Sequence, residues 1–345
     1  MIRMPRSGQC RAGPDKGIEP MQRRHRWMPK ILFGALAIFT VAGCASSTDG
    51  ASPGTSGSTS QITIGVGADA TYGEFFVADA QGLFKEAGLN VKIRKFAAGG
   101  DAIQAIAGKE VQLAGSSPTT LLTVAAENPD LRAPFVYMES GSYTKVVARP
   151  TIKAAADIKT FGVVPGLSTF LAHTYLKSEG IDPANVKFVS SDPATLPSLA
   201  QKGDVDAFVL WEPWPSRGVA LGLTVLQDTG SFDQPIMQVL AGNQEWIDQN
   251  ATEVATIAKV LQQASDFIKS DPEKASAAIA KATGGNQDQS VKDMALVNYG
   301  ARAYEESDYS AIAQQADFFV QAGTLKQAPE LKTIFLPSWY SENVK

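Results

Sequence analysis

The chain has 345 residues, which is long enough for two folded domains. Its composition, 44% hydrophobic and 19% charged, excludes a largely disordered protein and a polytopic membrane protein. The formal net charge of -4 is unevenly spread, because eight Lys/Arg precede Cys44, and from Cys44 onward 23 basic residues face 33 acidic ones. A body this acidic has no evident stripe of basic residues for binding phosphate backbones, so we expect no nucleic-acid partner.

The first predicted element is a signal peptide over residues 1–43. Four basic residues between 23 and 30 precede the apolar run 31–43, ILFGALAIFTVAG, which is shorter than the roughly 20 residues that span a bilayer. The run ends in Val-Ala-Gly-Cys44, which resembles a lipobox. In such signals the cysteine is lipidated and becomes the first mature residue. The alternative is an ordinary signal peptide cut close to Cys44.

A flexible tether is predicted next, over residues 44–60. The sequence after Cys44, ASSTDGASPGTSGSTS, contains no large apolar side chain and cannot offset its ordering entropy by burial. Sixteen such residues span on average about 20–24 Å, which suits a globule held near a membrane. No cysteine follows Cys44, so we expect no disulfide in the folded body.

From Ile62 to about residue 250, short apolar runs alternate with segments of helical spacing, which predicts βαβ units and largely parallel sheets. The predicted strands are 62–66, 91–96, 111–115, 134–138, 161–164, 186–189, 206–210 and 223–227, and the predicted helices are 73–87, 100–109, 118–127, 168–179, 193–201 and 213–221. Beyond about residue 250 the apolar spacing is helical and the strands are expected to stop.

Four strand ends share one design, a polar or glycine-containing turn followed by a helix start. Examples are Ser116-Ser117-Pro118, Pro165-Gly166-Leu167-Ser168-Thr169 and Ser191-Asp192-Pro193. The carboxyl ends of strands line the ligand crevice in open α/β sheets, and helix N-termini there suit an anion. Ordinary helix capping is the alternative explanation.

The fourth strand end, Trp211-Glu212-Pro213-Trp214, has a different chemistry. Two tryptophans flank a carboxylate, so an aromatic wall and an acid could hold a cationic group. The alternative is core packing by one tryptophan, with Glu212 capping its helix. Asp204 and Asp206 are predicted to be structural, at the entry to a strand.

Catalysis has little support in the residues. After the signal peptide the chain has one histidine, His173, and one cysteine, Cys44, so no His/Cys metal site can form. The chain has no GxSxG elbow or P-loop, and IGVGAD lacks the third glycine of a dinucleotide loop. We therefore expect no enzyme activity, no cofactor and no metal.

Several longer segments resemble the nitrate/sulfonate/taurine class of ABC-importer binding proteins. They are GLFKEAGLNVKI (82–93), GGDAIQAIAGKEVQLAGSSPTT (99–120), IKTFGVVPGLSTFLAHTYLKSEGIDPANVKFV (158–189) and LPSLAQKGDVDAFVLWEPWPSRGVALG (196–222). The resemblance covers about residues 62–245 and rests on the order and spacing of the motifs.

The resemblance implies a type II periplasmic-binding fold of two α/β lobes with a helical C-terminal extension and ligand between the lobes. Lobe 1 is expected over 61–145 plus 236–345, lobe 2 over 146–235, and the crossings near Tyr143–Arg149 and Pro235–Gly242. The ligand-binding residues carried over are Asp69, Thr71, Tyr72, Gly100, Ser116, Ser117, Thr119, Gly166, Ser168, Thr169, Asp192, Trp211 and Glu212.

The implied function is capture of a sulfonate, taurine, nitrate or similar molecule and its delivery to ABC permease and ATPase subunits by a lipid-anchored monomer. One departure bears on the ligand: Phe170-Leu171 stands where many relatives have a polar or basic residue. A pyrimidine or amine ligand therefore stays open. The alternatives in function are a sensor lipoprotein and a pyrimidine-synthase-like enzyme, since a fold does not fix a function.

Overall fold

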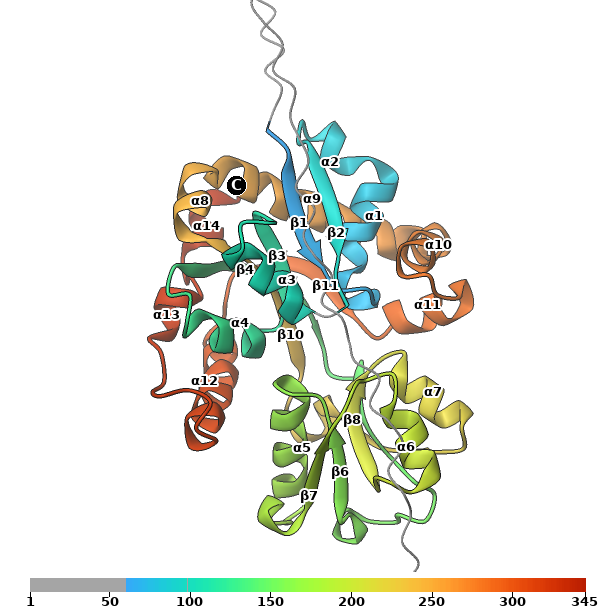
Figure 1. Ribbon diagram of the computed structural model, residues 1–345. Coiled ribbons are helices and arrows are strands. Elements are labelled where there is room, and N and C mark those ends of the chain that lie inside the picture. The colour runs from blue at the N-terminus through green and yellow to red at the C-terminus, as the bar shows by residue number, and fades with distance from the viewer. Residues whose placement is uncertain (1–59, 98) are drawn as a thin grey trace, which may run out of the picture. The chain divides into compact units, whose positions relative to one another are not determined.

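The computed structural model describes residues 60–97 and 99–345, and the signal peptide, Cys44 and nearly all of the tether predicted above lie outside them. The described chain contains two separate β-sheets, whose elements gather in two bodies (Figure 1). No helix among the described residues is both long and apolar enough to cross a bilayer.

The first sheet has six strands in the order β11-β4-β10-β3-β1-β2. Strand β1 pairs in parallel with β2 and β3, whereas β10 is antiparallel to both β3 and β4, and β11 is antiparallel to β4. The strands are β1 (Ile62–Val66), β2 (Val91–Lys95), β3 (Leu113–Ser116), β4 (Leu131–Ser140), β10 (Ile236–Asn243) and β11 (Asn298–Arg302).

The second sheet has five strands in the order β7-β6-β8-β5-β9. Strand β6 is parallel to β7 and β8, whereas β5 is antiparallel to β8 and β9. The strands are β5 (Thr144–Ala148), β6 (Thr160–Val163), β7 (Lys187–Ser190), β8 (Ala207–Trp211) and β9 (Thr224–Asp228).

Helices pack against both sheets. Helices α5 (Leu167–Ser178), α6 (Leu196–Lys202) and α7 (Trp214–Ala220) contact the second sheet. The rest belong with the first sheet: α1 (Gly73–Gln81), α2 (Leu83–Glu86), α3 (Gly99–Ala107), α4 (Pro118–Ala125), α8 (Gln244–Gln249), α9 (Ala251–Ser270), α10 (Pro272–Thr283), α11 (Gln287–Met294), α12 (Glu306–Gln321), α13 (Leu331–Ile334) and α14 (Trp339–Asn343).

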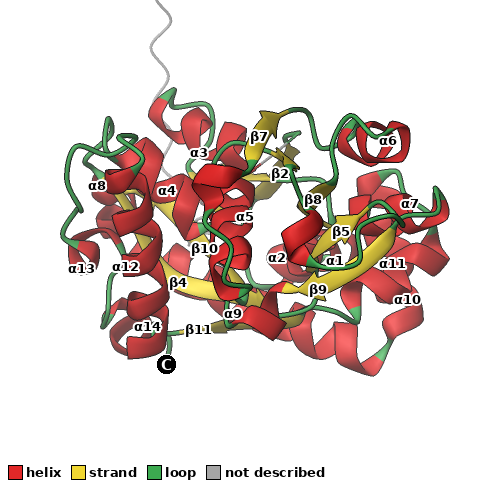
Figure 2. Cartoon of the chain, turned by 90° about the horizontal axis from the view of Figure 1, so that it is seen from below, coloured by secondary structure: helices red, strands yellow, loops and turns green. Residues whose placement is uncertain are grey.

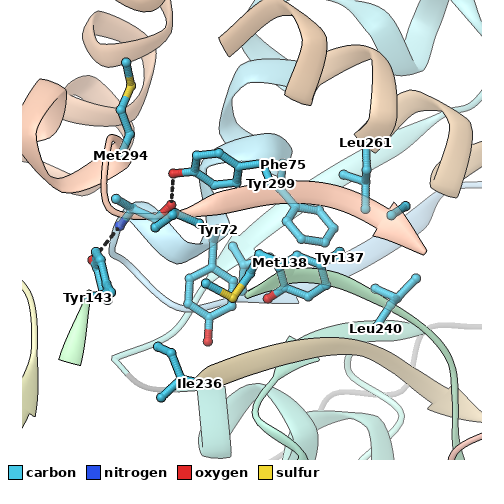
Figure 3. Close-up of a cluster of buried hydrophobic side chains, with 14 of the residues drawn as sticks. Tyr72, Phe75, Tyr137, Met138, Tyr143, Ile236, Leu240, Leu261, Met294 and Tyr299 are labelled. Atoms are coloured by element: carbon cyan, nitrogen blue, oxygen red, sulfur yellow. Dashed lines mark hydrogen bonds between the residues drawn. The ribbon is translucent and has the colours of Figure 1, made fainter. Parts of the chain in front are cut away.

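Both faces of the first sheet are buried, and its central strands alternate their side chains between two clusters. Leu240 packs with Phe75 and Leu261, from α1 and α9, and Figure 3 draws this cluster. Its neighbour Val239 packs with residues of α3, α4 and α12, such as Ile312. A strand buried on both faces reads as a continuous apolar run, as PFVYM (134–138) within β4 does.

The two sheets are joined by two short connections that touch. The chain leaves β4 through residues 141–143 to enter β5, and it returns from β9 through residues 229–235 to β10. The Gly230 N–H donates to the Gly141 carbonyl at 2.6 Å, and the Thr229 hydroxyl donates to the same oxygen at 3.2 Å. Because neither glycine has a Cβ, the two backbones can approach closely.

Two expectations about strands are wrong. The sheets are mixed rather than largely parallel, because β4 is followed directly by β5, and β9 by β10, with no crossover α-helix between them. A strand also follows residue 250: β11 pairs with β4 at the edge of the first sheet. Its sequence, NYGAR, buries only Tyr299 and Ala301, so it carries too little apolar pattern to be recognised.

Candidate functional site

A cavity of about 580 Å³ opens where carboxyl ends of strands from the two sheets face each other. Strands β1, β3, β6 and β8 end at this cavity, and helices α3, α4 and α5 begin there, so the turns that join strand to helix form its wall. Sequence-predicted residues in its lining are Asp69, Thr71, Tyr72, Gly100, Ser116, Ser117, Gly166, Ser168, Thr169 and Trp211.

Asp69, just after β1, is fixed by a chain of hydrogen bonds that starts in the core. Its Oδ1 accepts from the Thr71 N–H at 2.8 Å and from the Thr71 hydroxyl at 2.6 Å. Gln238 Nε2 donates to that same hydroxyl at 2.7 Å, and the Tyr137 hydroxyl donates to Gln238 Oε1 at 2.6 Å. Burial raises the pKa of the Asp69 carboxyl, against the opposing effect of the Thr71 bonds.

Tyr143 supports the same turn from the connection between the sheets. Its hydroxyl accepts from the Ala70 N–H at 3.2 Å and lies 3.4 Å from Asp69 Oδ1 and 3.1 Å from the Glu212 carbonyl oxygen. The Tyr299 hydroxyl donates to the carbonyl of Ala70 at 2.5 Å, so Ala70 is held on both sides (Figure 3). The turn that carries Asp69 is therefore rigidly placed.

Helix α5 begins at the cavity without a side-chain cap. Gly166, its N-cap residue, has φ 97°, a conformation that favours glycine. The nearby hydroxyls make internal bonds: Ser168 accepts from the Val164 N–H and donates to the Val209 carbonyl, and Thr169 donates to the Val164 carbonyl. The first N–H groups of α5 are thus the donors that remain for an oxygen of a ligand.

Helix α4 begins beside it with a different arrangement. The Ser117 hydroxyl accepts from the Thr120 N–H at 3.3 Å and so caps the helix. The neighbouring Ser116 is 1% exposed and lines the cavity. Thr144, at the start of β5, is 2% exposed, lines the cavity, and its hydroxyl has no hydrogen-bond partner among the described residues.

An aromatic wall closes one side of the cavity and comes from both bodies. His173 on α5 stacks on Phe188 with ring centroids 4.3 Å apart and meets Phe318 of α12 at 5.0 Å. Phe318 and Phe319 line the cavity with Tyr72 and Trp211, and α5 and α12 appear near each other in Figure 2 as well. Burial lowers the pKa of His173, which favours the neutral ring at physiological pH.

The charge of the cavity is distinctive. Asp69 is the one acidic side chain in the described lining, and no lysine or arginine of the described chain lines it. No group of three or more His, Cys, Asp or Glu side chains among residues 60–97 and 99–345 could hold a metal ion.

Three of the predicted ligand-binding residues do not line this cavity. The Thr119 hydroxyl is fully buried and donates to Gln315 Oε1 at 2.7 Å. Asp192 is exposed beyond β7. Glu212 is 1% exposed and forms an ion pair with Lys145, with 2.5 Å between Oε1 and Nζ.

Several lining residues are not among those predicted from the sequence. Thr144 and Gln238 lie in segments that were predicted as crossings, with no role assigned to individual side chains. Phe318 and Phe319 lie at the end of α12, where only the helical period was recognised. Gln104, Thr120, Thr123, Val124, Ile236, Ala322 and Thr324 also line the cavity without having been predicted.

The family profile described as the NMT1-like family matches residues 56–283, well over half of the chain. A taurine-binding periplasmic protein of Escherichia coli (strain K12) is 26% identical over 203 residues. That match covers 57% of this chain and 63% of the relative, so the chain matches less than two thirds of the relative's length.

Two solved structures show the fold. The periplasmic aliphatic sulphonate-binding protein of Escherichia coli is 17% identical with a TM-score of 0.71, covering 80% of this chain and 92% of that chain. The periplasmic nitrate-binding protein of Synechocystis PCC 6803 is 13% identical with a TM-score of 0.67, covering 83% of this chain and 88% of that chain. The predicted fold class, a two-lobed α/β periplasmic-binding fold, is thereby confirmed.

Proposed function

Since the chain belongs to the NMT1-like family, we propose that it is the extracytoplasmic solute-binding component of an ABC importer. It captures a small molecule between its two lobes and delivers it to a permease driven by an ATPase. The observation that carries this proposal is the 580 Å³ cavity where strand ends and helix N-termini of both sheets converge.

The geometry supports binding of a ligand with an oxygen-rich group, in line with the sulfonate- and taurine-binding relatives. The uncapped start of α5 supplies N–H donors and the positive end of a helix dipole. The Thr144 hydroxyl, which has no hydrogen-bond partner within residues 60–97 and 99–345, supplies a further group that a ligand can satisfy. Sulfonate, taurine, nitrate or a similar small molecule is the proposed cargo.

Delivery requires that the lobes close on the ligand. The hinge is proposed at the two connections that meet at Gly141 and Gly230, near the predicted crossings. Two short backbone segments joined by few bonds can absorb a change in dihedral angles while each sheet stays intact. The lobe boundaries, the ligand-binding role of the lining residues and the monomeric state remain predictions.

The chain is proposed to be anchored by a lipid on Cys44, with residues 45–60 as tether. Metabolic labelling with a palmitate analogue should mark the wild-type chain, and Cys44→Ala should lose the label and appear in the soluble fraction. A wild-type chain that carries no label and is not recovered with membranes would contradict the anchor.

The function is tested by a thermal-shift screen of the full chain in a mild detergent against taurine, ethanesulfonate, nitrate and simple amines. A ligand at 100 times its dissociation constant should stabilise the protein by about 2.7 kcal/mol, a clear rise in melting temperature. If no compound in the panel shifts the melting temperature and none is turned over, the transport proposal fails. Turnover of a bound compound would favour an enzyme.

A further inference from the structure

The carboxylate of Asp69 has one oxygen that is held by hydrogen bonds and one oxygen that the described chain leaves without a hydrogen-bond donor. Its Oδ1 accepts from both the N–H and the hydroxyl of Thr71, whereas its Oδ2 has no hydrogen-bond partner among the described residues. Asp69 is half-buried and lines the cavity. The bonds to one oxygen fix the plane of the carboxylate and leave the other oxygen for the ligand.

The remaining lining offers nothing that neutralises this charge. No lysine or arginine of the described chain lines the cavity, and the burial that lowers the pKa of His173 favours its neutral form. Because the site is partly shielded from water, an unpaired carboxylate there carries a desolvation cost that a bound cation would offset. The field at this end of the cavity therefore favours positive charge.

Glu212, the carboxylate at the tryptophan-flanked strand end, is unavailable. Glu212 is held by the ammonium of Lys145 and by the N–H of Ser216, and it is 1% exposed. Glu212 therefore cannot bind the cationic group of a ligand, although its position beside two tryptophans suggests that it could. Asp69 is the carboxylate that can. Trp211 and Tyr72 line the cavity with Asp69 and add aromatic faces, which attract an ammonium group.

We infer that Asp69 receives a protonated amine of the ligand, so that the imported molecule is an organic amine rather than a simple anion such as nitrate. This inference rests on the proposed function and names the substrate class of the same site. The α5 N-terminus, which supplies N–H donors, suits an oxygen at the other end of such a molecule. A cavity of about 580 Å³ has room for an apolar body between the two ends.

Matched pairs of probes test this directly by isothermal titration calorimetry of the full chain. Taurine is compared with 2-hydroxyethanesulfonate, and 3-phenylpropylamine with 3-phenylpropan-1-ol, so that only the amine changes to a hydroxyl. The amine of a pair should bind on the order of 10- to 100-fold more tightly, as one hydrogen bond to a charged group provides. Equal binding by the two members of a pair that binds overturns the inference.

Asp69→Asn should reduce that preference to about 3-fold or less, because the neutral amide keeps the shape without the charge. Asp79→Asn, at an exposed position outside the cavity, is the matched control and should keep the full preference. An unchanged preference in Asp69→Asn overturns the inference even if the variant binds well. The wild-type comparison stands by itself should that variant fail to fold.

The two proposals fail in different ways. Tight binding of nitrate or ethanesulfonate without any preference for amines would contradict the amine inference and would still support the proposed function. If neither pair, nor nitrate, nor ethanesulfonate binds, both proposals fail.

Discussion

Lys145 and Glu212 form a buried ion pair at the end of the second sheet, with Nζ and Oε1 2.5 Å apart. The antiparallel register of β5 and β8 pairs Thr144 with Trp211, which brings the two charged side chains together. The Lys145 side chain is 19% exposed and that of Glu212 is 2% exposed. The acid between the two tryptophans therefore has a structural partner 67 residues away in the sequence.

Replacing Lys145 by methionine should destabilise the protein by about 3 kcal/mol, because the buried carboxylate of Glu212 loses its counter-ion. Urea denaturation measures this as a change in the free energy of unfolding. The double variant Lys145→Met/Glu212→Gln should recover much of the loss, since no buried charge remains. A double variant no more stable than Lys145→Met would contradict this explanation.

Asp293 should make stability depend on pH near 6. It lies on α11 and accepts from Gln289 Nε2 at 2.7 Å, while the same amide lies 3.4 Å from the Ser216 hydroxyl of α7, so the two bodies meet here. Burial raises the pKa of Asp293 to about 6, with Glu212 and Asp69 adding to the rise and Lys145 opposing it.

A raised pKa means that the folded state binds this proton more tightly than the unfolded state, so this group costs stability as pH rises from about 4 through 6. Asp293→Asn should match the wild type at pH 4 and exceed its free energy of unfolding by roughly 1–2 kcal/mol at pH 8, after allowance for solvent screening. The exposed Asp288→Asn on the same helix should show no such pH-dependent difference. A constant difference for Asp293→Asn across this range would refute the assignment.

Asp206 should make the free energy of unfolding depend on pH in the opposite sense to Asp293. Burial tends to raise its pKa, but bonds from the N–H groups of Lys159 and Thr160, the Thr160 hydroxyl and Arg149 outweigh it and lower the pKa. A lowered pKa contributes stability above the unfolded value, which is lost as pH falls through the folded value. Asp206→Asn should cost roughly 1–3 kcal/mol at pH 7.

The neighbouring Asp204→Asn is the control for this prediction. Asp204 is exposed, whereas Asp206 is buried, so the control should change the free energy of unfolding by less than about 0.5 kcal/mol. Both variants are measured at pH 7 and pH 3. The loss in free energy of unfolding caused by Asp206→Asn should be smaller at pH 3, whereas Asp204→Asn should have little effect at either pH. Equal effects of the two substitutions at pH 7 would show that the Asp206 bonds contribute little.

Gly230→Ala should disturb the contact between the two connections. A Cβ at Gly230 would lie 3.0 Å from the Cα of Gly141 and 3.1 Å from its carbonyl oxygen, both backbone atoms that cannot rotate away. We expect a loss of roughly 1–3 kcal/mol in thermal or urea unfolding. Gly108→Ala is the matched control, since its Cβ would meet its nearest neighbour at 3.7 Å. Equal stability of the two alanine variants would argue against a close contact between the two connections.

Much of the fold could be predicted because the central strands of both sheets are buried on both faces. The run 134–138, PFVYM, stands out as a continuous apolar segment, and that prediction lies within β4. Strands β5 and β10 fall in segments that the resemblance marks as crossings, so they were not predicted as strands. Pairing partners distant in the sequence, and hence antiparallel register, leave no local signal.

The candidate site could be predicted where its residues follow strand ends, as Ser116 and Gly166 do. The wall formed by Phe318 and Phe319 could not, because it depends on how α12 packs beside α5. Glu212 was placed at the site because its position suits a ligand, while its ion pair with Lys145 is invisible without tertiary structure.

The most direct test of the binding site is a calorimetric titration of the full chain and of Gly100→Phe. Both are titrated with the compound of the thermal-shift panel that stabilises the wild type most. A Cβ at Gly100 meets only Thr120 at 3.5 Å, so the variant should fold, and both residues line the cavity, so the added ring should occupy it. We predict one saturable site per wild-type chain and a loss of binding of about 100-fold or more in Gly100→Phe, equal to about 2.7 kcal/mol. Undiminished binding by a folded Gly100→Phe would contradict a site between the two sheets.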